Sequence, residues 1–250
     1  SDIADGRHLY ATPKHFAGYG VPVGGHNGQP SALGQRELFS AHLEPFRMGV
    51  NAGVKTLMTS YNAIDGIPAT AHRYLLTDVL RDQWGFDGFV ISDLGSIEGI
   101  AGTHRVAANV KQAASMALRA GVDADLGGNA YGGSLMEALE EGLITMEEID
   151  RAASNILRMK FEMGLFENPY VDPAEAAHRV RSEEHRNLAR EVGRQGVVLL
   201  KNDNVLPLSK EVGSIAVIGP NADNMYNQLG DYTAPQDRAE IATVLDGIKR

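Results

Sequence analysis

The residue of this sequence best suited to chemistry is Asp93, which ends the run Ile91-Ser92-Asp93 directly after an apolar segment. A carboxylate at the end of a buried strand faces the mouth of a parallel β/α structure. There it could serve as the nucleophile of a retaining glycosidase, which needs a second carboxyl about 5 to 5.5 Å away to protonate the leaving oxygen. An aspartate that caps the helix after the strand fits the sequence equally well.

Two other strand ends carry side chains of the kind that recognise sugar hydroxyls. Lys14 and His15 end one apolar run, and a cation at that place would also keep a neighbouring carboxylate ionised. Tyr61 follows another run, where its phenol could donate a hydrogen bond to a carboxylate or a ring oxygen. Taken one at a time, a solvated lysine with a structural histidine and a core tyrosine are the commoner interpretations.

These residues are positioned by an alternation of apolar runs and helical patterns. The apolar runs predict buried strands over 9–16, 54–61, 88–93 and 121–126. The helical periodicity predicts helices over 35–52, 74–84, 106–120, 135–141 and 147–163. A capping box of Thr145 and Glu148 opens the last of them. The fold class is therefore α/β, with the chemistry at the carboxyl ends of parallel strands.

The pattern changes after residue 163. Two prolines within 168–173 interrupt regular structure, so a linker is predicted over 164–182. Beyond it, residues 183–193 indicate a helix, and the apolar runs at 197–200 and 215–220 indicate buried strands. Thr243 opens a final helix. This second part has the pattern of the beginning of another α/β domain.

Composition excludes several classes of partner and site. The formal charge of −9 disfavours nucleic acids and anionic membranes as partners, which leaves a small molecule. Zero cysteines exclude disulfides and thiolate catalysis. Asp123 and Asp125 end a strand without further ligands at metal-site spacing, and no phosphate-binding loop is present, so we expect neither a metal nor another cofactor. The first residues lack the basic and apolar regions of a signal peptide, and no apolar stretch is long enough for a membrane span.

An ordered set of motifs resembles glycoside hydrolase family 3, with the likeness nearest to its periplasmic β-glucosidases. Each motif alone is weak, but the set at matching spacing covers essentially the whole chain. The motifs lie at 14–20, 58–62, 65–70, 76–93, 197–202 and 215–222.

The resemblance implies a fold and a set of site residues. The family fold is a (β/α)8-like TIM barrel followed by an α/β sandwich, with the active site at their junction. Asp93 matches the catalytic nucleophile, Lys14 and His15 match the pair that grips sugar hydroxyls, and Tyr61 matches the tyrosine near the nucleophile. Leu94 departs from the tryptophan common after the nucleophile.

The resemblance also implies that parts of the family fold lie outside this chain. The first barrel strands would precede Ser1, and the acid/base glutamate would follow Arg250. Residues 1–163 would then form the C-terminal part of the barrel, 164–182 a linker, and 183–250 a linker helix with the start of the sandwich. Half a barrel has unpaired outer strands, which the missing parts or another chain would cover.

The leading hypothesis is a retaining, exo-acting β-glucosidase that acts on oligosaccharides or aryl glycosides, in which this chain supplies the nucleophile but not the acid/base. Leu94 and the segment 96–99 keep open a β-xylosidase or α-arabinofuranosidase. A catalytically incomplete carbohydrate-binding fragment is the alternative from another class, and Glu98 and Asp125 are the first acids to test if the fragment proves active. Family habit favours an extracytoplasmic location, in the bacterial periplasm or secreted.

Overall fold

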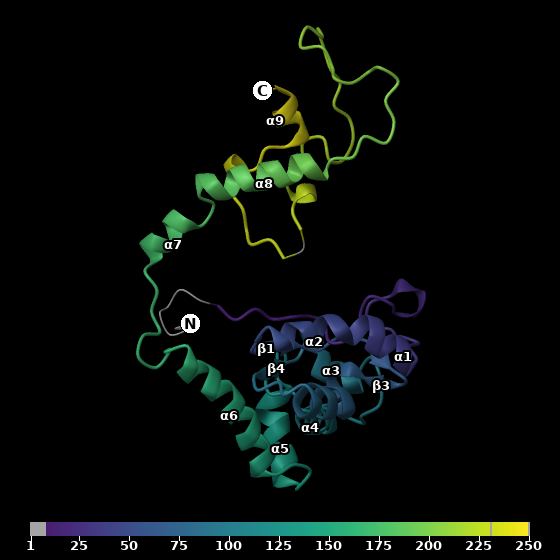
Figure 1. Cartoon of the computed structure of the whole chain (residues 1–250), viewed down its shortest axis with the longest axis vertical. Helices are drawn as coiled ribbons and strands as arrows, with labels where there is room; N and C mark the ends of the chain where they lie inside the picture. Colours follow the sequence, from purple (N-terminus) through teal and green to yellow (C-terminus); the bar gives the residue numbers. More distant parts are fainter. Residues whose placement is uncertain (1–8, 231, 250) are drawn as a thin grey trace. The chain divides into compact units, whose positions relative to one another are not determined.

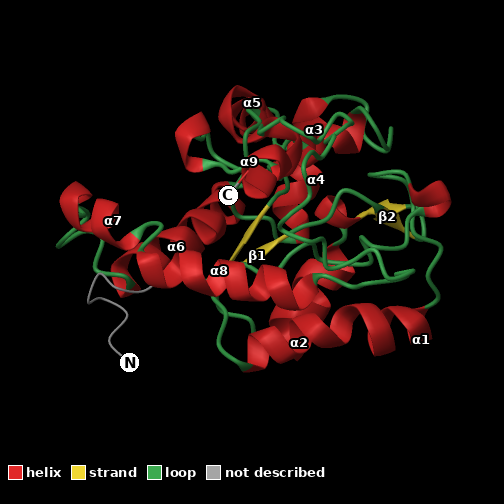
Figure 2. Cartoon of the chain, turned by 90° about the horizontal axis from the view of Figure 1, so that it is seen from above, coloured by secondary structure: helices red, strands yellow, loops and turns green. Residues whose placement is uncertain are grey.

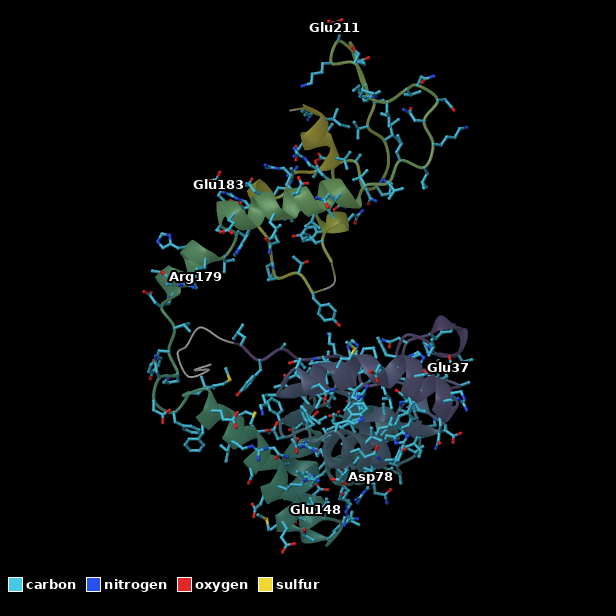
Figure 3. The ribbon with its side chains drawn as sticks, viewed as in Figure 1. Glu37, Asp78, Glu148, Arg179, Glu183 and Glu211 are labelled. Carbon is cyan, nitrogen blue, oxygen red and sulfur yellow. The ribbon has the colours of Figure 1, made fainter. Side chains whose placement is uncertain are left out.

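The computed structural model describes residues 9–230 and 232–249, in two compact units that divide between Pro173 and Ala174 (Figure 1). The first unit carries the strands and most of the buried side chains. Labelled carboxylates of this unit, at Glu37, Asp78 and Glu148, lie at its periphery (Figure 3). Among the described residues, no helix combines the length and the apolar character needed to cross a bilayer.

Four parallel segments lie side by side in chain order in the first unit. Strand β1 (Thr56–Met58) pairs in parallel with β4 (Phe89–Ile91); Figure 1 labels both, and Figure 2 shows the strands in yellow. Single parallel bridges join Phe16 to Thr59 and Ala124 to Ile91. The predicted strands around 56–58 and 89–91 are therefore confirmed. The outer two segments pair on one side only among the described residues, and they form bridges rather than strands.

The helices of the first unit follow these segments. The expected helix over 35–52 is continuous but changes pitch, from α1 (Gln35–Glu37) through a π-helical segment (Leu38–Leu43) to α2 (Glu44–Asn51). A second π-helical segment spans Tyr74–Gln83. The remaining α-helices are α3 (Ser96–Ala101), α4 (Val110–Ala120), α5 (Leu135–Glu140) and α6 (Met146–Glu162), and a third π-helical segment, Ala130–Ser134, precedes α5. These α-helices were all predicted except α3, whose six residues are too few to show a helical period.

Local side-chain bonds explain where two of these helices begin. The Thr145 hydroxyl accepts a bond from the Glu148 amide at 3.3 Å, and the Glu148 carboxylate accepts one from the Thr145 amide at 2.9 Å. The predicted capping box is thus confirmed. Asn109 caps α4 by accepting a bond from the amide of Gln112. Such caps satisfy donors that have no partner within the helix.

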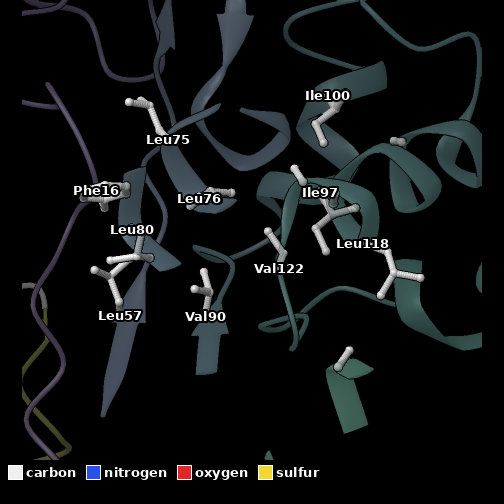
Figure 4. Packing of buried hydrophobic residues seen from close by; sticks show 14 of the residues in the cluster. Phe16, Leu57, Leu75, Leu76, Leu80, Val90, Ile97, Ile100, Leu118 and Val122 are labelled. Carbon is white, nitrogen blue, oxygen red and sulfur yellow. The ribbon is translucent and has the colours of Figure 1, made fainter. Parts of the chain in front are cut away.

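The core of the first unit lies between the parallel segments and the helices. Figure 4 shows Leu57 and Val90 of the strands facing Leu76 and Leu80 of the segment Tyr74–Gln83, and all four side chains are fully buried. Leu118 extends this core toward α4. Because the strand ends emerge from a closely packed core, the side chains beyond them are held in fixed positions.

A short hairpin after β1 was not predicted. Strands β2 (Ala63–Ile64) and β3 (Ile67–Pro68) are antiparallel, and the two residues between them, Asp65 and Gly66, both have positive φ angles. Two central residues with positive φ are the signature of a tight hairpin turn of type I′, for which Asp-Gly is a favoured pair. The sequence signal existed, but the flanking strands of two residues are too short to show alternation.

The second unit contains α8 (Glu183–Gly196) and α9 (Val244–Lys249), both expected from the sequence. Asp246 and Thr243 exchange backbone–side-chain bonds at the start of α9, as the prediction of a helix opened by Thr243 requires. Helix α7 (Pro173–Arg179) lies within the range expected to be linker, because proline is compatible with the first turn of a helix.

The two strands predicted in the second unit are wrong for this structure. Val197, Leu200 and Ile218 are 79%, 92% and 89% exposed, and the segments that contain them form no strand. An apolar run becomes a strand only where neighbours pair with its backbone and cover its side chains. The described residues of this unit supply neither to these runs.

Candidate active site

Asp93 lies two residues beyond the end of β4, at the side of the sheet where the neighbouring segments also end. Its Oδ1 accepts the amide of Leu94 at 2.7 Å, and its own amide points to the hydroxyl of Thr59 at 3.3 Å. Helix α3 has Gly95 as its N-cap and no side-chain cap. The helix-capping interpretation of Asp93 is therefore not what the structure shows.

The second carboxylate oxygen of Asp93 faces His15. Its Oδ2 lies 3.3 Å from His15 Nε2, but the contact does not have hydrogen-bond geometry, and Oδ2 accepts no hydrogen bond from the described residues. Oδ2 is also shielded from solvent. One oxygen of Asp93 is thus fixed by the backbone, while the other keeps its lone pairs next to an imidazole.

Two opposing effects set the charge of His15. Burial lowers the pKa of its imidazole, the Asp93 charge raises it, and the Lys14 charge lowers it again, with a net shift below 6.5. The imidazole is accordingly neutral at pH 7. A neutral ring with its proton on Nε2 can still donate to Asp93 or to a sugar hydroxyl.

Lys14 precedes His15 in the chain, and its side chain is exposed. Its positive charge lowers the pKa of the His15 imidazole. The structure therefore brings His15 next to Asp93, as the sequence analysis expected, and the Lys14 side chain is exposed to solvent.

Tyr61 contacts the residue after Asp93 rather than a carboxylate, which differs from the expectation. Its hydroxyl donates to the backbone carbonyl of Leu94 at 2.9 Å rather than to a carboxylate. Its own carbonyl oxygen lies 2.8 Å from His104 Nε2. Tyr61 thus ties the end of one strand to the residue that follows Asp93.

Three buried hydroxyl side chains that the sequence analysis did not single out support the backbone of Asp93. The hydroxyls of Thr59 and Thr70 lie 2.9 Å apart, and Thr70 also lies 3.0 Å from the hydroxyl of Ser96. All three side chains are buried. The Thr59 hydroxyl accepts a hydrogen bond from the Asp93 amide, and the Ser96 amide donates to the Asp93 carbonyl. The two residues at the ends of this hydroxyl chain therefore bind both backbone polar groups of Asp93.

Tyr19 lies in the loop that follows His15, and Asn62, which follows β1, binds that loop. The ring of Tyr19 lies 4.5 Å from the His15 ring between centroids. The buried amide of Asn62 donates to the carbonyls of Ala17 and Gly18 and to the hydroxyl of Ser31. Polar residues just after strand ends were the available signal for Asn62, but their partners could not be read from the sequence.

The other acids at strand ends have structural partners. Asp123 forms a buried ion pair with Arg81 at 2.5 Å and also accepts bonds from the Val90 amide and Asn155. Burial raises the pKa of its carboxyl, and Arg81 opposes that shift.

The two acids named as substitutes for a missing acid/base both bind backbone amides of one loop. Asp125 accepts the amides of Ala130 and Tyr131, and Glu98 accepts the amide of Asn129. Among the described residues, no three side chains of the types that ligate metals are grouped closely enough to bind an ion.

A pocket of about 290 Å³ opens next to Asp93. Its wall includes Tyr61, Leu94, Ser96 and His104, whereas Asp93 itself does not contribute to it. Leu94 is 61% exposed. This volume is at the small end of ligand pockets, which run from about 300 to 1,000 Å³.

Comparison with known proteins gives a consistent pattern. The family model described as the glycosyl hydrolase family 3 N terminal domain matches residues 4–159, and that of the family's C-terminal domain matches residues 197–250. A periplasmic beta-glucosidase of Salmonella typhimurium is 39% identical over 98% of this chain and 33% of that protein. A beta-xylosidase of Formosa agariphila is 36% identical over 98% of this chain and 36% of its own length.

Solved structures agree with the sequence matches. A beta-glucosidase involved in saponin metabolism from intestinal bacteria superimposes with a TM-score of 0.84 at 36% identity, covering 96% of this chain and 33% of the other. A beta-glucosidase from Listeria innocua in complex with glucose gives a TM-score of 0.75 at 35% identity, covering 84% and 30%. The chain spans about a third of the length of these relatives.

Proposed function

Because this chain belongs to glycosyl hydrolase family 3, we propose that it provides the nucleophile of a retaining, exo-acting β-glycosidase, and that the nucleophile is Asp93. The observation that carries the proposal is the state of the Asp93 carboxylate. Oδ1 is held by the Leu94 amide, and Oδ2 faces His15 without a hydrogen bond among the described residues. An oriented carboxylate with one unused oxygen is what attack on an anomeric carbon requires.

The reaction proceeds through two displacements. Asp93 Oδ2 forms a bond to the anomeric carbon as the glycosidic bond breaks, and a carboxylic acid gives its proton to the leaving oxygen. The same acid, now a carboxylate, then takes a proton from water, whose oxygen attacks the glycosyl ester and frees Asp93 with net retention.

We place the acid/base outside residues 1–250. Glu98 Oε1 and Asp125 Oδ2 accept the amides of residues 129–131, while Glu98 Oε2 has no hydrogen-bond partner among the described residues. A general acid must release and recover a proton during each cycle, and this exchange would disturb the support that the two carboxylates give to that loop.

Three further residues complete the sugar-binding site in this proposal. Lys14 and His15 bind hydroxyls of the glycone, and the neutral His15 ring does so without a fixed positive charge beside Oδ2. Tyr61 keeps Leu94, and with it the loop after the nucleophile, in place through its bond to the Leu94 carbonyl.

The substrate class is an oligosaccharide or aryl glycoside with a terminal glucosyl residue. The beta-glucosidases among the relatives favour this choice. Xylosyl or arabinofuranosyl substrates are the second candidate, because a beta-xylosidase is nearly as similar and Leu94 offers no aromatic wall at the pocket. Initial rates on matched aryl glucosides and aryl xylosides separate the two.

The architecture proposed for this function is the C-terminal half of a (β/α)8-like barrel over 1–163, a linker over 164–182, and the start of an α/β sandwich over 183–250. Four parallel segments in chain order, each followed by helical structure, support the barrel. The outer segments then pair with further barrel strands or with another chain. An extracytoplasmic location is proposed from the periplasmic relative.

A mechanism-based label tests the central assignment on the chain as it stands. A 2-deoxy-2-fluoroglucosyl fluoride has a leaving group that needs no general acid, so the nucleophile can be trapped even where the acid/base is absent. We expect mass spectrometry to find the sugar on Asp93, with no label in Asp93→Asn and full label in the matched surface variant Asp78→Asn. Label on another residue overturns the assignment of the nucleophile.

Turnover tests the alternative, a carbohydrate-binding fragment that does not complete the reaction. The proposal expects trapping of the activated fluoride but little hydrolysis of an unactivated glycoside by residues 1–250. Robust turnover of the unactivated glycoside would show an acid/base within the chain, and Glu98→Gln and Asp125→Asn would then identify it.

A further inference from the structure

The segment that follows Asp93 returns to the neighbouring parallel segment. Helix α3 begins three residues after Asp93 and is fixed to the core by Ile97 and Ile100, both fully buried and both labelled in Figure 4. Three residues beyond this helix, the imidazole Nε2 of His104 lies 2.8 Å from the carbonyl oxygen of Tyr61. The chain that leaves one strand end at Asp93 is therefore bound, through His104, to the residues that follow β1.

The backbone on both sides of His104 is fixed. The His104 amide donates to the carbonyl of Gly99 at 2.9 Å, and the Val106 amide donates to that of Ile100 at 3.0 Å. Arg105, between them, has a φ of 55°, a left-handed conformation that costs free energy for a residue with a side chain. Such conformations persist where the surrounding structure enforces them, and they are frequent at functional sites. The His104 imidazole is thus presented from a rigid turn.

The contact with Tyr61 defines which nitrogen of the His104 ring carries a proton. A carbonyl oxygen can only accept a hydrogen bond, so Nε2 must be the donor. A protonated ring would keep the same bond, because both of its nitrogens donate. The bond therefore needs a donor at the Nε2 position, and it does not need an acceptor at Nδ1.

Tyr61 connects His104 to Asp93. The Tyr61 hydroxyl donates to the Leu94 carbonyl at 2.9 Å, and the Leu94 amide donates to Asp93 Oδ1 at 2.7 Å. The hydroxyl of Thr59, two residues before Tyr61, accepts the Asp93 amide at 3.3 Å. A displacement of the Tyr61 backbone would therefore reach Asp93 through both its carboxylate and its amide.

We propose that His104 is a positioning residue for the reaction assigned to Asp93, an inference that rests on the proposed function. It acts through Tyr61 and Leu94, and it keeps the Asp93 carboxylate in the orientation needed for attack on the anomeric carbon. Orientation of reacting groups provides a large part of many rate enhancements, and small misplacements lower the rate. His104 also lines the pocket of about 290 Å³, so the test separates positioning from a direct role in sugar binding.

Two amide substitutions at position 104 provide this test. In His104→Gln the side-chain nitrogen can reach the place of Nε2, whereas in His104→Asn, which is shorter by one methylene, it reaches only the place of Nδ1. We expect the maximal rate of fluorosugar labelling to fall about tenfold in His104→Asn, with a half-saturating concentration within about twofold of the original, and to be retained in His104→Gln. A role in sugar binding would instead change the half-saturating concentration.

Thr77→Val is the matched control. The Thr77 hydroxyl donates to the Ala120 carbonyl at 2.8 Å, so this variant also loses a bond from a side chain to a backbone carbonyl, in a residue that is not bonded to those at Asp93. Its urea midpoint is compared with that of His104→Asn, and its labelling rate should not change. An unchanged rate in His104→Asn, an equal loss in Thr77→Val, or labelling as slow in His104→Gln as in His104→Asn overturns the proposal.

Hydrogen exchange of the Leu94 amide gives a readout that needs no reaction. This amide donates to Asp93 Oδ1, and we expect NMR to show exchange about fivefold or more faster in His104→Asn and unchanged in His104→Gln. If exchange follows this pattern but no sugar is found on Asp93 in the original chain, the assignment of the nucleophile fails while the link from His104 to Asp93 holds. Equal exchange in all three proteins overturns that link, even where Asp93 is labelled.

Discussion

Asp93 lies beyond the end of β4, whereas Asp123 lies in the neighbouring parallel segment, one residue before Ala124, and the two carboxylates have opposite surroundings. Asp123 is paired with Arg81 and accepts further bonds from Val90 and Asn155. Asp93 has a single strong bond, and its second oxygen faces a neutral histidine. A carboxylate with partners on both oxygens holds a fold together, whereas one with an unused oxygen can form a new bond.

The largest effect is expected from Asp93→Asn. The amide oxygen can still accept the Leu94 amide, so the fold is kept, but the nucleophile is lost, and the rate of labelling by the fluorosugar should fall about 10³-fold or more. Label accumulation by mass spectrometry and the unfolding midpoint are measured together. If Asp93→Asn were labelled at the original rate, Asp93 would not be the nucleophile, and its role would be structural, like that of Asp123.

Asp123→Ala should have the opposite effect: it should lower the stability of the fold rather than remove a reacting group. It leaves the Arg81 guanidinium buried without its counterion, which costs about 3–5 kcal/mol of unfolding free energy. Urea denaturation of this variant is compared with that of Asp87→Ala, which breaks a more exposed pair with Lys55. Equal losses in the two variants would contradict the structural role.

The double variant Asp123→Leu with Arg81→Met separates desolvation from attraction. Replacing both members of a buried pair by apolar side chains is often neutral or stabilising, so stability should recover most of the loss seen in Asp123→Ala. Further loss in the double variant would show that the pair itself, and not the unpaired charge, provides the stability.

Thr70→Val should affect Asp93 from a distance. The substitution leaves the hydroxyls of Thr59 and Ser96 without their shared partner, at a cost of about 1–3 kcal/mol, and it weakens the support of the Asp93 backbone. We therefore expect a slower labelling step with a nearly unchanged concentration dependence. Thr70→Ser restores the hydroxyl and should restore the rate, which a loss of stability alone would not explain.

The smallest effect concerns pH. Asp93 contacts the imidazole of His15, which can gain a proton, whereas Asp123 is paired with the Arg81 guanidinium, which keeps its charge. The pKa of His15 is lowered in the folded state, so the unfolded chain binds its proton more readily. The resulting stability is present above the unfolded pKa of about 6.5 and is lost as pH falls through it. His15→Gln should make the urea midpoint less sensitive to pH between about 7 and 5. An unchanged slope would exclude His15 as its source.

Local patterns in the sequence predicted most of the first unit. The capping box at Thr145 and the helical periods were readable because their partners lie three or four residues away. The meeting of His15 with Asp93 also followed, since parallel strands end at one edge. The hydroxyl chain could not be predicted, because it depends on how Thr59, Thr70 and Ser96 turn their side chains inside a packed core.

The second unit shows where such patterns fail. The runs at 197–200 and 215–220 have the composition of buried strands, but they are largely exposed and unpaired in this structure. Apolar composition describes only what a segment can bury, whereas a strand also needs a neighbour that accepts its backbone bonds. The short strands β1 and β4 do form, because each lies between two parallel partners that accept and donate backbone hydrogen bonds.

Those parallel partners have a consequence for biosynthesis. Each pairing among these four segments joins a segment to the next one along the chain, across a connection that contains helical structure. Each new β/α unit can therefore dock on the one made before it as the polypeptide leaves the ribosome, and loop closure never has to span more than one unit at a time.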